Sequence, residues 1–191
     1  TSSTRRVDIG GLPPREPQPV DLDDWPERTA EEAKALTLPT SNPLEKKRRH
    51  EALERADATP RVSGDPRIEW ILSRLPGWKK RGEKILLFVS RRDALDILKK
   101  EIEFRTNIRV AVFHEDLSPG QRDIEVAQFA TPDGPTLLIS TECGGEGRNF
   151  EFCRRLILFD LPWDPVLVEQ RIGRLDRINR RRPVEIVYFR A

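Results

Sequence analysis

The 191-residue sequence has no methionine, one tyrosine, two cysteines and two histidines. Cys143 and Cys153 are too few for a disulfide framework. Together with His50 and His114 they follow no zinc-binding spacing, so we expect reduced thiols and no metal site of that kind. The missing methionines include an initiator, which suggests that the chain is part of a longer protein.

Long apolar runs are also missing. No stretch approaches the roughly 20 residues that a helix needs to cross a bilayer. The N-terminus, Thr1–Arg6, is polar and has no apolar stretch behind it, unlike a signal peptide. We therefore expect a cytoplasmic protein without membrane contact.

Neither sign of charge dominates overall, because 34 basic residues face 32 acidic ones, for a formal net charge of +2. The distribution is uneven, however. Seven arginines lie between Gln170 and Arg190, against only Asp176 and Glu185. A basic pole of this kind suits nucleotide phosphates or nucleic acid, although a solvated arginine-rich face has the same composition.

The first third of the chain differs from the rest, since nine of the 16 prolines lie at or before Pro66. Proline fixes φ and removes a backbone donor, so we expect this part to be largely irregular. Two helices are still indicated, over 30–36 behind a Thr29–Glu32 capping box and from Asn42 to about residue 56. We divide the chain into an extension that leads into the lobe, 1–64, and an α/β lobe, 65–191.

From residue 65 onward, short apolar runs alternate with helical patterns. We expect strands at 84–89, 109–113, 136–140, 156–160 and 184–189, and helices at 91–104, 119–129 and 165–178. Alternation of this kind predicts a parallel sheet of about five or six strands with helices on both faces. In such sheets the chemistry gathers in loops at the carboxyl ends of the strands.

Two segments fit that expectation. The loop 140–150, STECGGEGRNF, carries three glycines in four positions, which allow a phosphate to approach the backbone closely. It lacks the Gly-Lys-Ser/Thr ending of a Walker A loop, and a plain tight connection is the alternative. In the second segment, Gln170, Arg174 and Arg177 have the i, i+4, i+7 spacing of one helix face, beside Gly173. Two arginines on one face form a fork for a polyphosphate, as an alternative to an ordinary basic helix.

These segments together resemble superfamily 2 helicases. The sequence QRIGRLDR, residues 170–177, matches the Gln-x-x-Gly-Arg-x-x-Arg motif VI, and 140–150 is similar to motif V. The sequence FDLPWDP, 159–165, is typical of the SWI/SNF type. DPRIEW, 65–70, and VFHED, 112–116, resemble the bacterial branch associated with RNA polymerase. The resemblance covers 65–190 well, 1–20 loosely, and leaves 20–60 unexplained.

The resemblance implies a RecA-like second lobe of an ATP-dependent translocase, inactive alone. Arg174 and Arg177 are then arginine fingers that reach ATP bound on the first lobe. Gln170 and Gly173, with Gly145 and Glu146, are expected near the nucleotide. No Walker A loop and no Asp-Glu-x-His motif occurs here, so the magnesium ligands are expected on the first lobe.

The resemblance also implies contacts to a nucleic-acid backbone, with double-stranded DNA the expected ligand. The residues concerned are Ser140, Thr141 and Gly144 of motif V, together with His114 and Arg91. A hydrogen-bonded structural histidine and a helix-surface arginine are the alternatives for the last two. The first lobe is one expected partner, and RNA polymerase or another protein complex is a second.

Several alternatives stay open on sequence alone. The chain fits a motor lobe of an antiphage defence system, a non-catalytic RecA-like module that binds protein or DNA, and, with less support, a small nucleotide-binding domain that uses the motif V glycines on their own. DNA against RNA, translocation against unwinding, and oligomeric state are not indicated. Trp70 and Trp78 fit a helix stripe that faces the core, with a docking surface as the alternative.

Overall fold

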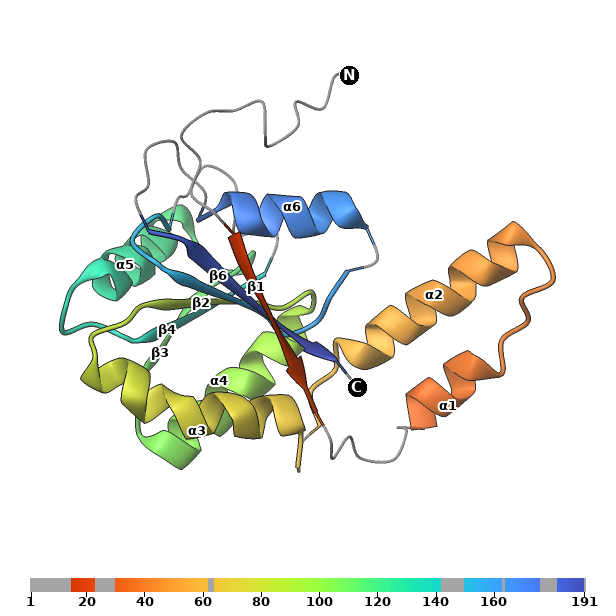
Figure 1. Ribbon diagram of the computed structural model, residues 1–191, viewed down its shortest axis with the longest axis horizontal. Helices are drawn as coiled ribbons and strands as arrows, with labels where there is room; N and C mark the ends of the chain where they lie inside the picture. The colour runs from red at the N-terminus through yellow and green to blue at the C-terminus, as the bar shows by residue number, and fades with distance from the viewer. Residues whose placement is uncertain are drawn as a thin grey trace, which may run out of the picture.

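The structure is a computed structural model, and it describes residues 15–22, 30–61, 64–141, 150–162, 164–175 and 182–190. A parallel sheet in the order β1-β6-β5-β2-β4-β3 forms its centre (Figure 1). The strands are β1 (Arg15–Asp21), β2 (Ile85–Phe88), β3 (Val110–Phe113), β4 (Leu137–Ser140), β5 (Arg155–Leu158) and β6 (Val184–Arg190). The helices are α1 (Ala30–Leu36), α2 (Pro43–Asp57), α3 (Pro66–Lys80), α4 (Arg92–Thr106), α5 (Pro119–Ala130) and α6 (Pro165–Gly173). The predicted fold class is confirmed.

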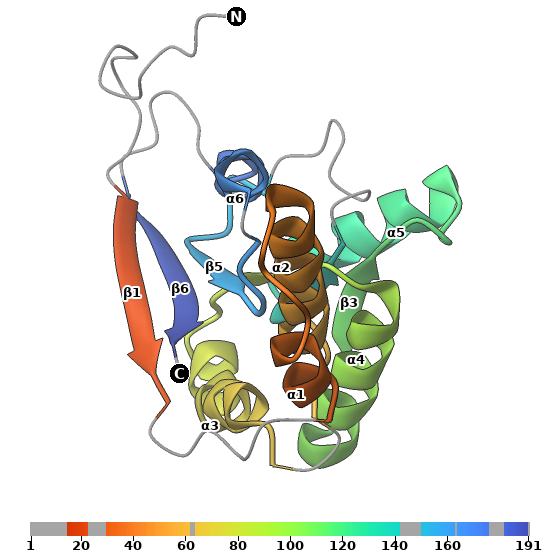
Figure 2. The ribbon, with the colours of Figure 1, turned by 90° about the vertical axis from the view of Figure 1, so that its right-hand side faces the viewer.

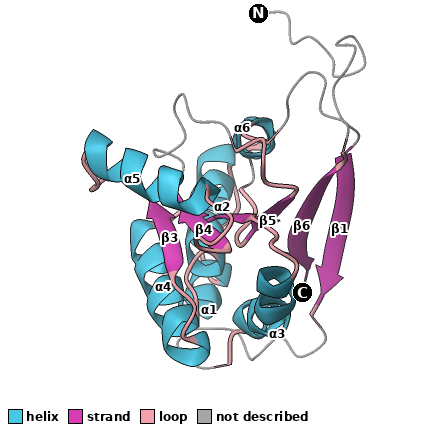
Figure 3. Cartoon of the chain, turned by 90° about the vertical axis from the view of Figure 1, so that its left-hand side faces the viewer, coloured by secondary structure: helices cyan, strands magenta, loops and turns pink. Residues whose placement is uncertain are grey.

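Helices cover both faces of the sheet (Figure 3). Leu87 and its alternate neighbours along the strands pack with α3 and α4, and Leu86 and its alternates pack with Phe129 of α5 and Ile172 of α6. Because successive side chains in a strand point to opposite faces, a run of apolar residues such as ILLF feeds both cores. The continuous apolar strands noted in the sequence are thereby explained.

The sheet gains a strand that the sequence did not predict. β1 lies within the proline-rich segment expected to be irregular, and it pairs in parallel with β6 at the sheet edge. Pro17 and Pro19 have no backbone N–H to donate. An inner strand pairs with a neighbour on each side and would lose those hydrogen bonds, whereas an edge strand pairs on one side only and tolerates the loss. The prolines therefore mark an edge strand here rather than an absence of structure.

α1 and α2 form a helical extension (residues 30–61) beside the lobe (Figure 2). α2 begins as predicted, with Asn42 accepting a hydrogen bond from the Glu45 N–H and proline in the first turn. Thr29 of the other predicted cap lies outside the described residues. α2 buries only Ala56 along its length, so the extension adds little to either core.

Arg67 of α3 joins the extension to the lobe. Its guanidinium donates to both carboxylate oxygens of Asp65, to the Asp57 carbonyl at 2.7 Å and to the Phe159 carbonyl at 3.2 Å. It also lies 3.9 Å from the centroid of the Phe159 ring. One buried cation thus connects the end of α2 with the end of β5.

Among the described helices, none is long and apolar enough to cross a membrane.

Candidate nucleotide and nucleic-acid site

The carboxyl ends of four strands come together at one edge of the sheet. The Val89 N–H donates to the Ser140 carbonyl at 3.0 Å, the Thr141 N–H to the Phe113 carbonyl at 3.1 Å, and the Phe159 N–H to the Phe88 carbonyl at 3.1 Å. These bonds align the residues that follow β2, β3, β4 and β5. From the sequence we expected the functional residues to lie in loops at this carboxyl edge.

A buried network at this edge holds α6 against the sheet. Arg171 of α6 donates to the Asp160 carbonyl at 2.8 Å and to the Ser90 hydroxyl at 2.8 Å, and it forms an ion pair with the Asp160 carboxylate at 3.3 Å. The Ser90 N–H donates to Asp160 at 2.8 Å. The Arg171 and Asp160 side chains are 1% and 4% exposed. A charge so deeply buried requires such partners, and they fix α6 relative to the ends of β2 and β5.

The sequence analysis missed this role of Arg171. Two features of the sequence were compatible with it, because Asp160 ends the apolar run 156–159 and Arg171 lies three residues before the presumed finger Arg174. Nothing in the spacing shows which arginine of a basic segment turns inward, since that depends on contacts across 81 residues of chain. The arginine-rich pole therefore contains at least one structural cation.

Arg174 follows the last residue of α6. The predicted helix over 165–178 is too long: α6 ends at Gly173, and the Arg174 N–H donates to the Arg171 carbonyl at 3.2 Å. Its φ of −67° and ψ of −25° still continue the helical path, so it stays near the Gln170 face. Arg177 lies outside the described residues, and the joint face of all three residues is therefore a prediction still.

The Arg174 side chain is half-buried and has no ion pair among the described residues. Its carbonyl accepts from the Phe150 N–H at 2.9 Å, which fixes its backbone to the end of the glycine-rich loop. Gln170 and Gly173 are exposed on the same short helix. A guanidinium on an anchored backbone and without an acidic partner is suited to bind a phosphate.

Most of the glycine-rich loop lies outside the described residues. These include Gly144, Gly145 and Glu146, so their predicted roles stay predictions. The flanking residues are placed: Phe150 is fully buried and packs against Phe113 and Phe129. Both ends of the loop are therefore anchored at the carboxyl edge.

The hydroxyls of Ser140 and Thr141 face inward. Ser140 is 0% exposed and donates to the Thr141 carbonyl at 2.9 Å. Thr141 is 3% exposed and donates to the Glu115 carboxylate at 2.8 Å. With both hydroxyls bonded inside the lobe, these residues shape the start of the loop in this structure.

His114 follows β3 and is 5% exposed. Among the described residues its Nδ1 has no hydrogen-bond partner. Burial, and next the nearby Arg92 guanidinium, lower the pKa of His114. A neutral imidazole adds no charge to attract a phosphate backbone, so its predicted contact would be a hydrogen bond.

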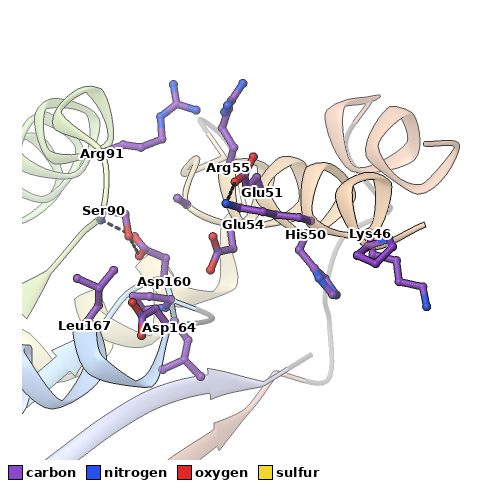
Figure 4. Close-up of a pocket in the computed structure, with 15 residues that line it drawn as sticks. Lys46, His50, Glu51, Glu54, Arg55, Ser90, Arg91, Asp160, Asp164 and Leu167 are labelled. Carbon is purple, nitrogen blue, oxygen red and sulfur yellow. Dashed lines mark hydrogen bonds and ion pairs between the residues drawn. The ribbon is translucent and has the colours of Figure 1, made fainter. Parts of the chain in front are cut away.

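Arg91, the residue before α4, has partners within the chain. Its guanidinium donates to Asp93 and, at 3.0 Å, to the Thr59 hydroxyl after α2. It lies at the rim of a groove of about 1100 Å³ between α2 and the carboxyl edge, which we call the edge groove. In Figure 4 the side chains of Arg55 and Arg91 point away from Asp160 and Asp164. Lys46, Lys47, Glu51 and Glu54 also line the edge groove, so its wall carries charges of both signs.

A metal site is not formed by the described residues, in which no three His, Cys, Asp or Glu side chains are grouped to hold an ion. What this edge offers a nucleotide is the Arg174 guanidinium with the exposed amide of Gln170. Both groups suit the phosphate and polar parts of ATP.

The parallel sheet, covered by helices on both faces and with loops anchored at its carboxyl ends, defines an α/β lobe. Residues 66–179 match the family "helicase conserved C-terminal domain". The chain belongs to this family, and its parallel α/β sheet has the RecA-like fold. The resemblance drawn from motifs V and VI is thereby confirmed.

Individual relatives agree with this assignment. The chain is 47% identical over 124 residues to "RNA polymerase-associated protein RapA" of Yersinia pestis (strain Pestoides F), and equally to that of Yersinia pseudotuberculosis serotype O:1b. Those residues are 64% of this chain and 13% of each relative.

Among solved structures, the "SWI2/SNF2 ATPase core in complex with dsDNA" of Sulfolobus solfataricus is similar to this chain. It is 21% identical with a TM-score of 0.72, over 92% of this chain and 41% of that one. At this identity the likeness establishes the fold alone.

Proposed function

We propose that this chain is the second motor lobe of an ATP-dependent translocase that acts on double-stranded DNA. The proposal depends on a first RecA-like lobe that binds ATP and magnesium, with this lobe completing the site. The Yersinia relatives are named as associated with RNA polymerase, and one solved neighbour is in complex with double-stranded DNA. We extend these properties to the present chain, including a partner such as RNA polymerase and a cytoplasmic location.

The position of Arg174 is the observation that supports the proposal most. Arg171 anchors α6 from beneath, and the Phe150–Arg174 backbone bond ties the end of α6 to the glycine-rich loop. The backbone that carries the free guanidinium is thus fixed before ATP arrives. Such preorganised charge can neutralise the γ-phosphate as negative charge shifts during hydrolysis. Arg177 is proposed as the second finger, and Gln170, Gly173, Gly145 and Glu146 as neighbours of the nucleotide.

Nucleic acid would lie across the other end of the carboxyl edge, over β3 and β4. There the proposed contacts are His114, Gly144 and the start of the loop at Ser140–Thr141, with Arg91 near the boundary. Because the two hydroxyls are bonded inside the lobe, backbone N–H groups of the loop are the better donors to phosphate. Contacts of this kind position a duplex without reading its sequence.

The decisive experiment measures ATP hydrolysis by the complete protein, with and without duplex DNA, for wild type and Arg174→Ala. An arginine finger typically contributes about 10³–10⁵ in rate, so we expect turnover to fall by at least about a hundredfold. The fold should be unaffected, since no described residue depends on the Arg174 side chain. Arg48→Ala, which removes an exposed charge from α2, is the matched control and should hydrolyse ATP like wild type.

Each outcome separates the hypotheses. Normal hydrolysis by Arg174→Ala would disprove the finger assignment while leaving the motor intact. A wild-type protein without any ATPase activity, but with affinity for protein or DNA, would favour a non-catalytic binding module.

A further inference from the structure

A second surface of the lobe lies along α3 and β1, at the side of the sheet opposite to β3 and β4. It is a hollow of about 390 Å³ between α3 and β1, which we call the tryptophan hollow. Trp70, Trp78 and Arg74 of α3 line it, together with Gln18 of β1, Arg81 and Arg155. Figures 1 and 3 show α3 beside this edge of the sheet.

The charges of the tryptophan hollow have one sign, because all its charged lining residues are arginines. Arg155 is neutralised by Glu83 at 2.7 Å and by Glu185 at 2.7 Å. Arg81 shares Glu83, at 2.5 Å. Arg74 has no acidic partner among the described residues. The hollow therefore presents uncompensated positive charge.

Arg74 is also held in place. Its guanidinium lies 4.1 Å from the centroid of the Trp70 ring and donates to the Ser73 hydroxyl at 3.1 Å and to the Trp70 carbonyl at 3.3 Å. Trp70 is itself wedged between Trp78, at 5.9 Å, and Phe189, at 5.5 Å between ring centroids. Burial, and then the charge of Arg155, lower the pKa of Arg74, as expected for a cation that lacks a counterion.

The absence of a side chain at Gly77 leaves room for the guanidinium of Arg81 beside the hollow. A Cβ at this position would lie 3.2 Å from Nη1 of Arg81. Without that atom, Arg81 folds back over the helix toward the same space. Two guanidinium groups beside an aromatic wall are suited to bind a carboxylate and an adjacent apolar side chain.

We propose that the tryptophan hollow is a docking site for an acidic peptide segment of a protein partner. A carboxylate would pair with Arg74 and Arg81, and an apolar neighbour would contact the exposed part of Trp70. Nucleic acid is the weaker candidate, since the proposed duplex contacts lie over β3 and β4, at the other end of the strand order from β1. The site does not depend on the motor function, because it needs neither ATP nor Arg174.

The test is fluorescence anisotropy with the 191-residue chain and a labelled ten-residue peptide of glutamates interleaved with leucine and phenylalanine. We expect saturable binding that weakens about tenfold in Arg74→Gln and about equally when the peptide carries glutamine in place of glutamate. Gly77→Ala, whose methyl group would crowd the Arg81 guanidinium at 3.2 Å, should weaken binding by at most about twofold. Arg48→Gln on α2 removes the same charge elsewhere and should bind like wild type.

Three results would overturn the proposal. One is no saturable binding up to about 1 mM peptide. Another is an equal loss in Arg74→Gln and Arg48→Gln, which would indicate nonspecific attraction to net charge. The third is a duplex oligonucleotide that displaces the peptide and itself requires Arg74, which would make the hollow a nucleic-acid site. Loss of ATPase activity in Arg174→Ala bears on none of these outcomes.

Discussion

The lobe and the helical extension are stabilised in different ways. In the lobe, two apolar layers enclose the sheet, and residues such as Leu86 and Leu87 are fully buried. In the extension, α2 buries only Ala56, and Leu44 is 59% exposed. Apolar burial supplies most of the stability of a folded domain, so the extension must be held against the lobe by something else.

A few polar contacts hold the extension to the lobe, and we call the place where residues 57–61 meet the lobe the seam. Arg67 reaches the carbonyls of Asp57 and Thr59, and Arg91 reaches the Thr59 hydroxyl. The Arg61 N–H donates to the Asp65 carboxylate at 3.0 Å. Hydrogen bonds and ion pairs depend on geometry, pH and salt much more than apolar packing does. We therefore expect the extension to respond to conditions and single substitutions that leave the lobe unchanged.

The largest effect is expected for Arg67→Met, which removes the central cation of the seam. Burial pushes the pKa of Asp65 upward, but the hydrogen bonds and charge of Arg67 outweigh it and hold that pKa below its usual value. Without Arg67 the fully buried Asp65 carboxylate is unpaired. Breaking a buried pair costs about 3–5 kcal/mol in the free energy of unfolding. Urea denaturation measures this loss, and hydrogen exchange should show α2 opening first.

A double variant checks the cause. Asp65→Asn combined with Arg67→Met removes both charges and should recover part of the lost stability. If Arg67→Met unfolds at the wild-type urea concentration and α2 stays protected from exchange, the seam does not depend on this cation. The contrast between lobe and extension would then need another explanation.

The next effect compares leucines in the two regions. Leu87→Ala empties space in the core between the sheet and α3–α4, and we expect a loss of about 2–5 kcal/mol. Leu44→Ala deletes the same atoms from an exposed site at the start of α2, and should change stability by less than about 0.5 kcal/mol. Thermal or chemical unfolding distinguishes them. Similar losses for both would mean that the extension buries apolar surface in solution.

Sequence periodicity predicted the lobe well for a physical reason. Strands such as 85–88 are apolar on both faces and helices such as α5 carry complete caps, so local pattern and tertiary environment agree. β1 was missed because proline lowers strand propensity everywhere except at an edge, and edge position is a property of the whole sheet. α6 was predicted to reach residue 178 because Gln170, Arg174 and Arg177 have helical spacing, whereas the described helix ends at Gly173.

The site was predicted less completely than the fold. Motif VI identified α6, yet only the position of Asp160 shows that Arg171 is a buried structural cation, while Arg174 is half-buried and has no ion pair among the described residues. Arg67 is similar: DPRIEW located the segment, but not its bonds to the end of α2. Long-range polar pairs leave no periodic trace in a sequence, and the seam and the α6 anchor consist of such pairs.

The smallest expected effect sharpens the contrast through pH. Burial, opposed in part by Arg67, raises the pKa of Asp57 at the end of α2 to about 6, from an ordinary 3.8. A carboxyl whose pKa is raised on folding favours the folded state when protonated. Its contribution is therefore complete below pH 3.8 and is lost as the pH rises through about 6. Asp57→Asn stays neutral and should be more stable than wild type at pH 7, with no advantage near pH 4.

The gain should be less than about 1 kcal/mol, because the Asp57 side chain is 43% exposed and solvent screens its charge. Protection of α2 amides from hydrogen exchange, measured at pH 5 and 7 after correction for intrinsic rates, locates the change. The difference between variant and wild type should grow with pH in α2 and stay near zero in β2 and β4. A difference spread evenly over the sheet would mean that extension and lobe open together, and that the seam couples them as firmly as the cores do.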